Sequence, residues 1–207
     1  MSRIILAIAF SILAFASAEA TIRLTSERLT PNVVVVFETS LGNFEISVDV
    51  DHAPITAANF LKYVDDGAYN KGFFHRTVRP DTESRKDYPI QVVQASPAKG
   101  TANREAIKLE RTNVTGLKHF AGTVSMARSG ADTATSDFFI CITDSPELDF
   151  GGRRNADGQG FAAFGKVITG MDIVKKIQAS PTKAGENGKQ SQSLEPQIVI
   201  LKAYRKK

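Results

Sequence analysis

Short apolar segments of strand-like length, separated by turn residues, fill most of the sequence and restrict the folds open to it. Val33 to Phe37 is a run dominated by β-branched residues, and Phe44 to Asp49 alternates apolar and polar residues with a period of two. A β-branched run is typical of a strand, and the alternation indicates a strand with one buried face. Leu41-Gly42-Asn43 predicts a turn between them, so we expect a hairpin.

More apolar pieces follow, each ended by Gly, Pro or polar turn residues. They are Phe73-Phe74, Ile90 to Val93, Gly122 to Ala127, Phe138 to Thr143, Phe161 to Ile168 and the closing segment Gln197 to Ala203. Several strands at such spacing indicate a β-sandwich or a closed barrel. The chain has no Trp and one Cys, so the markers of an immunoglobulin-type sandwich are missing. We predict a mainly β fold.

Two segments have helical periodicity instead. After Pro54, which suits a first helical position, apolar residues recur at three-residue spacing until Asp65-Asp66-Gly67. Met171 to Ile177 repeats the pattern between Gly170 and Pro181. Both segments are predicted as helices, because apolar residues at this spacing form one buried stripe.

Two polar stretches between apolar pieces are predicted as loops of functional length. They are Arg79 to Pro89, which is rich in charge, and Asp149 to Gly160, which is rich in glycine. The second is no phosphate-binding loop, because no Lys-Ser or Lys-Thr follows it and no strand-to-helix context surrounds it.

The first twenty residues have the features of a secretory signal peptide. Met1-Ser2-Arg3 gives a positive start, Ile4 to Phe15 is apolar, and Ala16-Ser17-Ala18 offers a cleavage site, with Ala18-Glu19-Ala20 as an alternative. An uncleaved membrane anchor is the other reading. We favour cleavage, because the apolar run is shorter than the ~20 residues that span a bilayer.

The remaining chain divides into three expected parts. Residues 21–32 form a polar lead-in, residues 33–204 form one folded domain, and residues 205–207 form a basic tail in solvent. No segment after the signal is long and apolar enough to span a membrane, so we expect no membrane association after cleavage.

Charge and metal-ligand patterns exclude several function classes. The formal net charge is +4, but basic and acidic residues alternate and only residues 205–207 form a basic run, so we expect no nucleic-acid binding. Cys141 is alone, which excludes an internal disulfide, a cysteine zinc site and a thiol redox motif. His52, His75 and His119 lack metal-ligand spacing. We expect no metal and no cofactor.

Six short motifs, in their order and spacing, resemble the cyclophilin family. They are Phe74-His75-Arg76, Val93-Gln94, Gly122 to Arg128, Ser136 to Ile140, Leu148-Asp149, and Phe164 to Val167 with Gly170 to Val174. The resemblance covers Val33 to Tyr204, and Ala53 to Phe60 is similar to the family's first helix. It implies an eight-stranded antiparallel β-barrel capped by two α-helices, with peptidyl-prolyl cis-trans isomerase activity on proline-containing polypeptides.

The physics of this reaction determines which residue types it needs. Rotation about a peptide C–N bond has a barrier of ~18–20 kcal/mol, because the amide loses its resonance as it twists. No bond is cleaved, so a catalyst needs only to bind the twisted amide better than the planar one. A fixed guanidinium suits this task, because it can donate to the prolyl nitrogen when that nitrogen regains its lone pair.

The resemblance implies roles for Arg76 and Gln94 in catalysis. Arg76 matches the arginine of the family's Phe-His-Arg motif, and Gln94 matches the glutamine that steadies this arginine and the substrate backbone. A surface salt bridge for Arg76 and an exposed strand amide for Gln94 are the plainer alternatives. His75 is interpreted as structural, because the chemistry needs no proton transfer.

Five more residues are expected to bind substrate. Phe139 matches the floor of the family's proline pocket, while Phe138 should point to the opposite face of the strand. Ala127 matches a residue that pairs with the peptide, and Leu148 matches a pocket wall. Two alternative interpretations stay open: Ala127 as a small packing residue, and Leu148 as a buried anchor of its loop. Arg128 and Phe161 complete the set.

The sequence departs from the common family pattern after the Phe-His-Arg motif. The charged Arg79 to Pro89 replaces a short Pro-Gly-Phe-Met stretch, so that Gln91 and Val92 stand where Phe and Met are usual. We therefore expect a less aromatic pocket.

Four single positions also differ from the family pattern. Asp137 replaces a glutamine, Arg128 an asparagine, Phe161 a histidine and Glu147 the tryptophan of drug-sensitive members. Phe161 is expected to restore some apolar wall. Substrate preference and cyclosporin binding are therefore open.

Three functions are weighed on these grounds. The first is an isomerase for exported, folding proteins, expected as a monomer in a bacterial periplasm or, alternatively, secreted. The second is a low-turnover chaperone that holds proline-containing segments on the same fold. The third is a small-ligand carrier with a cavity inside an eight-stranded barrel. The match at Arg76, Gln94 and Phe139 favours the isomerase.

Overall fold

The computed structural model describes residues 32–185 and 190–207. The predicted signal peptide, and the lead-in up to residue 31, lie outside the described residues.

The chain enters the fold through the predicted hairpin. Strands β1 (Val33–Thr39) and β2 (Gly42–Val48) pair antiparallel. Gly42 follows the turn with φ of 128°, and a Cβ there would lie 2.7 Å from the Ile173 side chain. The backbone conformation therefore favours glycine at this position, and a larger residue would also have to displace the end of the Ile173 side chain.

Eight strands form a closed antiparallel barrel in the order β1-β2-β7-β5-β6-β4-β3-β9, and β9 pairs back with β1. The remaining bounds are β3 Phe73–Val78, β4 Val92–Ser96, β5 Thr123–Met126, β6 Phe138–Cys141, β7 Ala163–Thr169, β8 Thr182–Ala184 and β9 Gln190–Arg205. Closure leaves no open sheet edge within the barrel. The prediction of an eight-stranded antiparallel barrel is confirmed, and β8 adds a ninth strand as a hairpin on β9.

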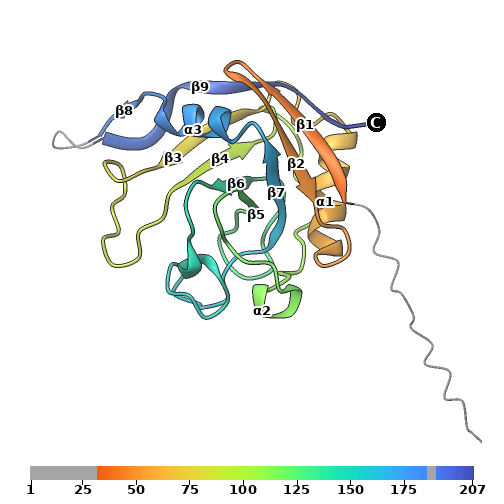
Figure 1. Ribbon diagram of the computed structural model, residues 1–207, viewed down its shortest axis with the longest axis vertical. Coiled ribbons are helices and arrows are strands. Elements are labelled where there is room, and N and C mark those ends of the chain that lie inside the picture. The colour runs from red at the N-terminus through yellow and green to blue at the C-terminus, as the bar shows by residue number, and fades with distance from the viewer. Residues whose placement is uncertain (1–31, 186–189) are drawn as a thin grey trace, which may run out of the picture.

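Helices cover the barrel on different sides (Figure 1). Helix α1 (Pro54–Asp65) contacts β7 and β9, and α3 (Met171–Ala179) contacts β2, β3 and β4. These are the two predicted helices. The structure also has the four-residue helix α2 (Thr112–Thr115) and the 3-10 turn Pro146–Leu148. Both are too short for a helical repeat of apolar residues to be recognised in the sequence.

Large side chains fill the interior of the barrel. Phe60 on α1 packs 4.8 Å from Phe164 and 5.5 Å from Phe138, measured between ring centroids. Phe37 stacks on Phe44 in the same cluster, and all five rings are fully buried. A carrier cavity inside the barrel is therefore excluded, because this space is occupied by the core.

A second, smaller apolar cluster lies on the outer face of the barrel. It consists of Val78, Ile90, Val92, Phe139, Cys141 and Leu148, with Ala127 and Phe161 packed against it. Successive residues of a strand point to opposite faces, so β4 and β6 supply side chains to both clusters. This second cluster carries the candidate site.

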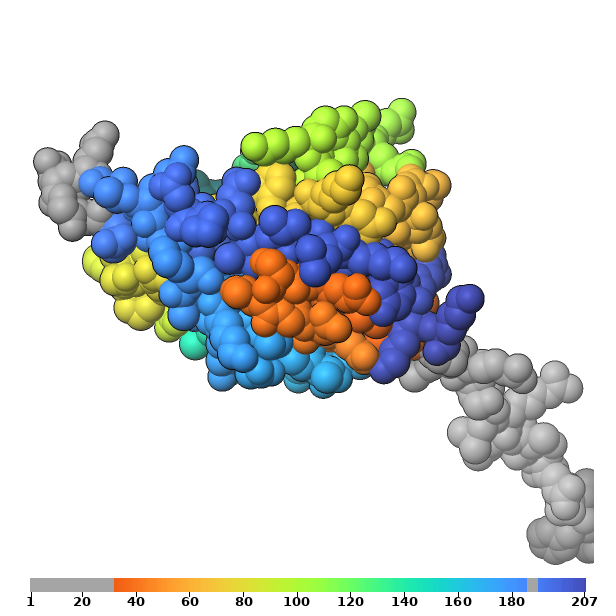
Figure 2. Space-filling model, turned by 90° about the horizontal axis from the view of Figure 1, so that it is seen from above, coloured from red at the N-terminus to blue at the C-terminus, as the bar shows by residue number. Residues whose placement is uncertain are grey.

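The C-terminal strand is longer than the sequence indicated. It begins at Gln190 rather than Gln197 and continues through Arg205, beside the β1–β2 hairpin (Figure 2). Arg205 pairs with Asp65 at 2.6 Å, and Lys206 pairs with Glu45 at 2.7 Å. Two of the three residues expected in a solvated tail therefore contact the folded domain, Arg205 at α1 and Lys206 at β2.

Candidate active site

Arg76 reaches the outer face because of a bulge in β3. Phe74 pairs with Ala95 and Arg76 pairs with Gln94, so His75 is an extra residue opposite β4. The pairing with β9 shifts at the same place. A bulge reverses the alternation of side chains. Phe74 therefore points into the barrel core, while Arg76, two residues later, lines a pocket outside it.

Two glutamine amides hold the Arg76 guanidinium. Arg76 Nη1 donates to Gln94 Oε1 at 3.0 Å. Nε and Nη2 donate to Gln192 Oε1 at 2.9 and 2.7 Å. Burial and the nearby Arg154 lower the pKa of Arg76, but an arginine stays charged at any neutral pH. Arg76 is thus a fixed cation bonded to amides, and it forms no salt bridge with any residue that the structure describes.

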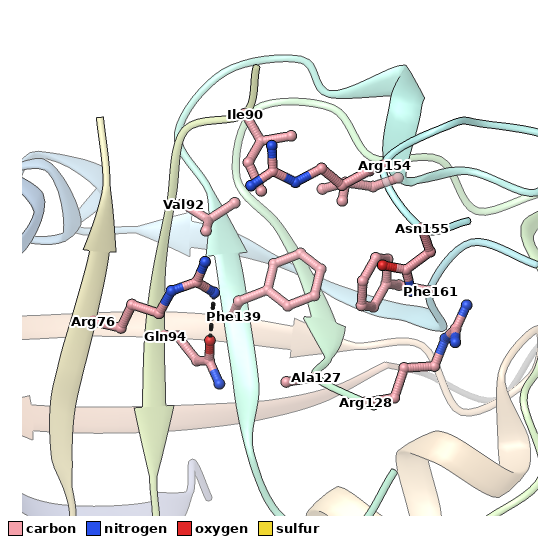
Figure 3. Close-up of a pocket in the computed structure, with 11 residues that line it drawn as sticks. Arg76, Ile90, Val92, Gln94, Ala127, Arg128, Phe139, Arg154, Asn155 and Phe161 are labelled. Atoms are coloured by element: carbon pink, nitrogen blue, oxygen red, sulfur yellow. Dashed lines mark hydrogen bonds between the residues drawn. The ribbon is translucent and has the colours of Figure 1, made fainter. Parts of the chain in front are cut away.

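A pocket of about 280 Å³ with an apolar floor and a polar rim lies beside this cation (Figure 3). Phe139 is 5% exposed, and its ring meets Phe161 edge-on at 5.4 Å. Ile90, Val92 and Leu148 supply aliphatic walls. The Arg76 guanidinium points toward the Phe139 ring in Figure 3. A compact apolar group placed on Phe139 would therefore lie next to a charged hydrogen-bond donor.

All seven residues predicted for the site line this one pocket: Arg76, Gln94, Ala127, Arg128, Phe139, Leu148 and Phe161. Their roles toward a substrate stay predictions, but they come together from strands and loops far apart in sequence.

Arg128 lines the pocket with its guanidinium already engaged. Its Nε donates to the Gly160 carbonyl at 2.7 Å and its Nη1 donates to Asp157 at 2.8 Å. The guanidinium also lies 5.0 Å from the centre of the Phe161 ring. Arg128 thereby fixes the position of Phe161, which forms part of the pocket wall.

The aliphatic walls differ in one respect from the sequence-based expectation. Ile90 and Val92 line the pocket, whereas Gln91, expected to stand in a pocket position, bonds with Gln178 on α3. Alternation along the chain places Gln91 on the other side from its two neighbours. This wall of the pocket is aliphatic, and the comparison with the usual family pocket stays a prediction.

Sequence reasoning missed the contacts that connect the two long loops. Glu83 and Arg154 form an ion pair at 2.9 Å, with side chains only 2% and 10% exposed. Glu83 also accepts from the backbone N–H groups of Arg85 and Ile90. Arg154 lines the pocket together with Asn155. A pairing across 71 residues leaves no local sequence signal.

His75 lies beside the site but outside the pocket lining. Its Nδ1 is 3.2 Å from Ser96 Oγ, which donates to Asp137 at 2.7 Å. Burial lowers the pKa of His75, an effect that Arg76 reinforces and Asp137 opposes. The imidazole is therefore neutral at pH 7, in keeping with a structural role.

In residues 32–185 and 190–207, no group of three or more His, Cys, Asp or Glu side chains is placed to hold a metal ion. Within the same residues, no helix has the length and apolar character needed to cross a membrane.

Comparison with known proteins agrees with the fold. Residues 34–205 match the family model described as cyclophilin type peptidyl-prolyl cis-trans isomerase/CLD. Peptidyl-prolyl cis-trans isomerase B of Escherichia coli is 36% identical over 169 residues, which cover 81% of this chain and 96% of that protein. Peptidyl-prolyl cis-trans isomerase A of Dickeya dadantii is 38% identical over 159 residues, covering 74% and 75% of the two chains.

A solved structure shows the same fold at lower identity. The cyclophilin type isomerase of Cryptosporidium parvum superposes with a TM-score of 0.66 at 20% identity, covering 85% of this chain and 98% of that one.

The closed barrel, with a pocket on its outer face that has an apolar floor and a cation at its edge, defines a cyclophilin-like protein. The chain belongs to the cyclophilin-type peptidyl-prolyl cis-trans isomerase family. It is an isomerase, and its substrates are proline-containing polypeptides.

Proposed function

We propose that this pocket accelerates X-Pro rotation by binding the twisted amide more tightly than either planar isomer. The proline ring lies on Phe139, and Arg76 donates to the prolyl nitrogen. A guanidinium has five N–H groups, and the bonds to Gln94 and Gln192 use three of them. One N–H on Nη1 and one on Nη2 make no hydrogen bond to the described part of the chain and are left for a substrate. This geometry is the observation that supports the proposal.

The preference for the twisted state has two physical sources. The lone pair of the prolyl nitrogen is delocalised in the planar amide and becomes a hydrogen-bond acceptor only as the bond rotates. A donor placed beside this nitrogen therefore stabilises the transition state. The apolar walls also remove water that solvates the charge-separated planar form. Each ~1.4 kcal/mol of preference for the twisted state gives a tenfold rate increase.

Arg76→Ala tests this proposal in a proline-peptide isomerisation assay. We expect kcat/KM to fall by about a hundredfold or more, as with the loss of a preorganised transition-state donor. Affinity for the planar peptide should change little, because Arg76 acts on the twisted state. Arg205→Ala, on the far part of β9, is the matched control and should turn over at the wild-type rate.

The same experiment identifies the chaperone alternative. Wild-type turnover equal to that of Arg76→Ala, with proline peptides bound by both proteins, would mean that the pocket binds the planar isomers as tightly as the twisted amide. Such a pocket does not catalyse the rotation. That result would contradict the proposed mechanism and favour a holding function.

We further propose that the enzyme acts on exported proteins as they fold, in a bacterial periplasm or secreted from the cell. Residues 1–20 support this by their charged start, apolar run and small residues at the cleavage site. Uncatalysed X-Pro isomerisation takes tens to hundreds of seconds, which limits refolding after export. Fractionation of bacteria that express the full chain, with N-terminal sequencing of the product, tests both export and the cleavage site. Size-exclusion chromatography tests the expected monomer.

A further inference from the structure

We propose that Gln192 is a positioning residue for catalysis, which acts only by holding Arg76. This inference rests on the proposed role of Arg76. Gln192 lies on β9, 116 residues beyond Arg76 in the chain.

Gln192 and Gln94 restrain different parts of the same guanidinium. Gln192 Oε1 accepts from Nε and Nη2 at 2.9 and 2.7 Å, while Gln94 Oε1 accepts from Nη1 at 3.0 Å. A single acceptor would leave the planar group free to pivot about one bond. Two acceptors at different edges fix its plane, and hydrogen bonds from a charged donor are stronger than neutral ones.

The orientation of the Gln192 amide is itself determined by a neighbour. Its Nε2 donates to the Thr82 carbonyl at 3.1 Å. A backbone carbonyl can only accept, so the amide nitrogen must face Thr82 and the amide oxygen must face Arg76. The reversed amide would place two oxygens together at Thr82 and N–H groups against the guanidinium.

The Arg79–Pro89 loop therefore supports the cation through Gln192. Thr82 precedes Glu83, whose buried ion pair with Arg154 anchors the loop at the other side of the pocket. The register of β3 and β9, which pairs Arg76 with Ser193, brings Gln192 within reach. Through these contacts, β9 and the Arg79–Pro89 loop together orient Arg76.

The test is Gln192→Leu, which keeps side-chain bulk but removes both the acceptor and the donor. We expect kcat/KM for a proline peptide to fall about tenfold, with peptide affinity within about twofold of wild type. Gln192→Glu keeps an acceptor for the guanidinium but places a carboxylate oxygen against the Thr82 carbonyl, so it should recover only part of the lost rate. Gln197→Leu, an exposed residue of the same strand, is the matched control and should leave the rate unchanged.

A double-mutant cycle separates positioning from general damage. In the Arg76→Ala background, Gln192→Leu should cause no further loss, because the residue through which it acts is gone. An equal loss in both backgrounds would overturn the proposal. So would wild-type kcat/KM in Gln192→Leu while Arg76→Ala is impaired. If Arg76→Ala itself keeps the wild-type rate, the mechanism fails at Arg76 and the role of Gln192 fails with it.

Discussion

Phe138 and Phe139 are adjacent on β6, yet their rings belong to separate apolar clusters on opposite faces of the barrel wall. Phe138 is fully buried against Phe60 and Tyr69 in the interior. Phe139 lines the pocket and contacts Phe161. One strand thus divides a Phe-Phe pair between the barrel core and the candidate site.

Substituting each of these two rings by leucine should separate the two tasks. Phe138→Leu should lower the free energy of unfolding by about 1–3 kcal/mol, with little change in kcat/KM per folded molecule. Phe139→Leu should lower kcat/KM roughly two- to tenfold, since a ring contact contributes about 0.5–1.5 kcal/mol. Urea unfolding and an isomerisation assay measure the two effects. Equal activity losses in both variants would contradict this division.

Removing the buried charge of Glu83 should strongly destabilise the protein. Glu83→Gln leaves Arg154 without its ion-pair partner in a site where both side chains are nearly buried. Loss of one partner of a buried pair costs about 3–5 kcal/mol, which urea unfolding would detect. Asp87→Asn, which breaks an exposed pair with Arg85 in the same loop, is the control and should change nothing measurable. An unchanged unfolding free energy in Glu83→Gln would refute the prediction.

Acid should also weaken the fold through Glu83. Burial raises the pKa of its carboxyl, but hydrogen bonds from Arg85, Ile90 and Arg154 outweigh this, so the pKa lies below its usual 4.5. A lowered pKa in the folded state contributes stability above pH 4.5, and this contribution is lost as the pH falls through the folded-state value. Glu83→Gln should show a shallower loss of stability below pH 4.5 than the wild type.

His75 should affect stability rather than turnover as the pH changes. Burial lowers its pKa below 6.5, so the unfolded chain takes up its proton first and stability falls as the pH drops below 6.5. His75→Gln should remove that part of the slope in thermal unfolding below pH 6.5. The same variant should keep kcat/KM within about threefold at pH 7. A hundredfold loss there would instead point to proton transfer.

Cys141 should be inert while the protein is folded. Its thiol is buried within the second cluster, and burial raises its pKa to about 12. The thiolate is the reactive form, so a thiol reagent at pH 8 should label the urea-unfolded chain and spare the native one. Rapid labelling of the native protein would mean that the second cluster opens readily.

Much of the fold follows from local sequence. The alternation in Phe44 to Asp49 and the β-branched run at Val33 predict strands, since half-buried strands need that pattern. Three-residue spacing predicts the helices after Pro54 and Met171 in the same way. The opposite orientation of Phe138 and Phe139 follows from the geometry of a strand. The site residues were predicted only through resemblance to a family.

Tertiary structure alone determined how the site is assembled. By strict alternation, Arg76 would share a face with Phe74 and point into the core; the bulge at His75 turns it outward. That bulge depends on the register of β3 with both β4 and β9, which no local pattern encodes. The contact of Gln192 with Arg76 likewise arises only when strands distant in sequence pair. Sequence thus determined which faces are apolar, whereas barrel closure determined which side chains meet, because register is set by the whole sheet.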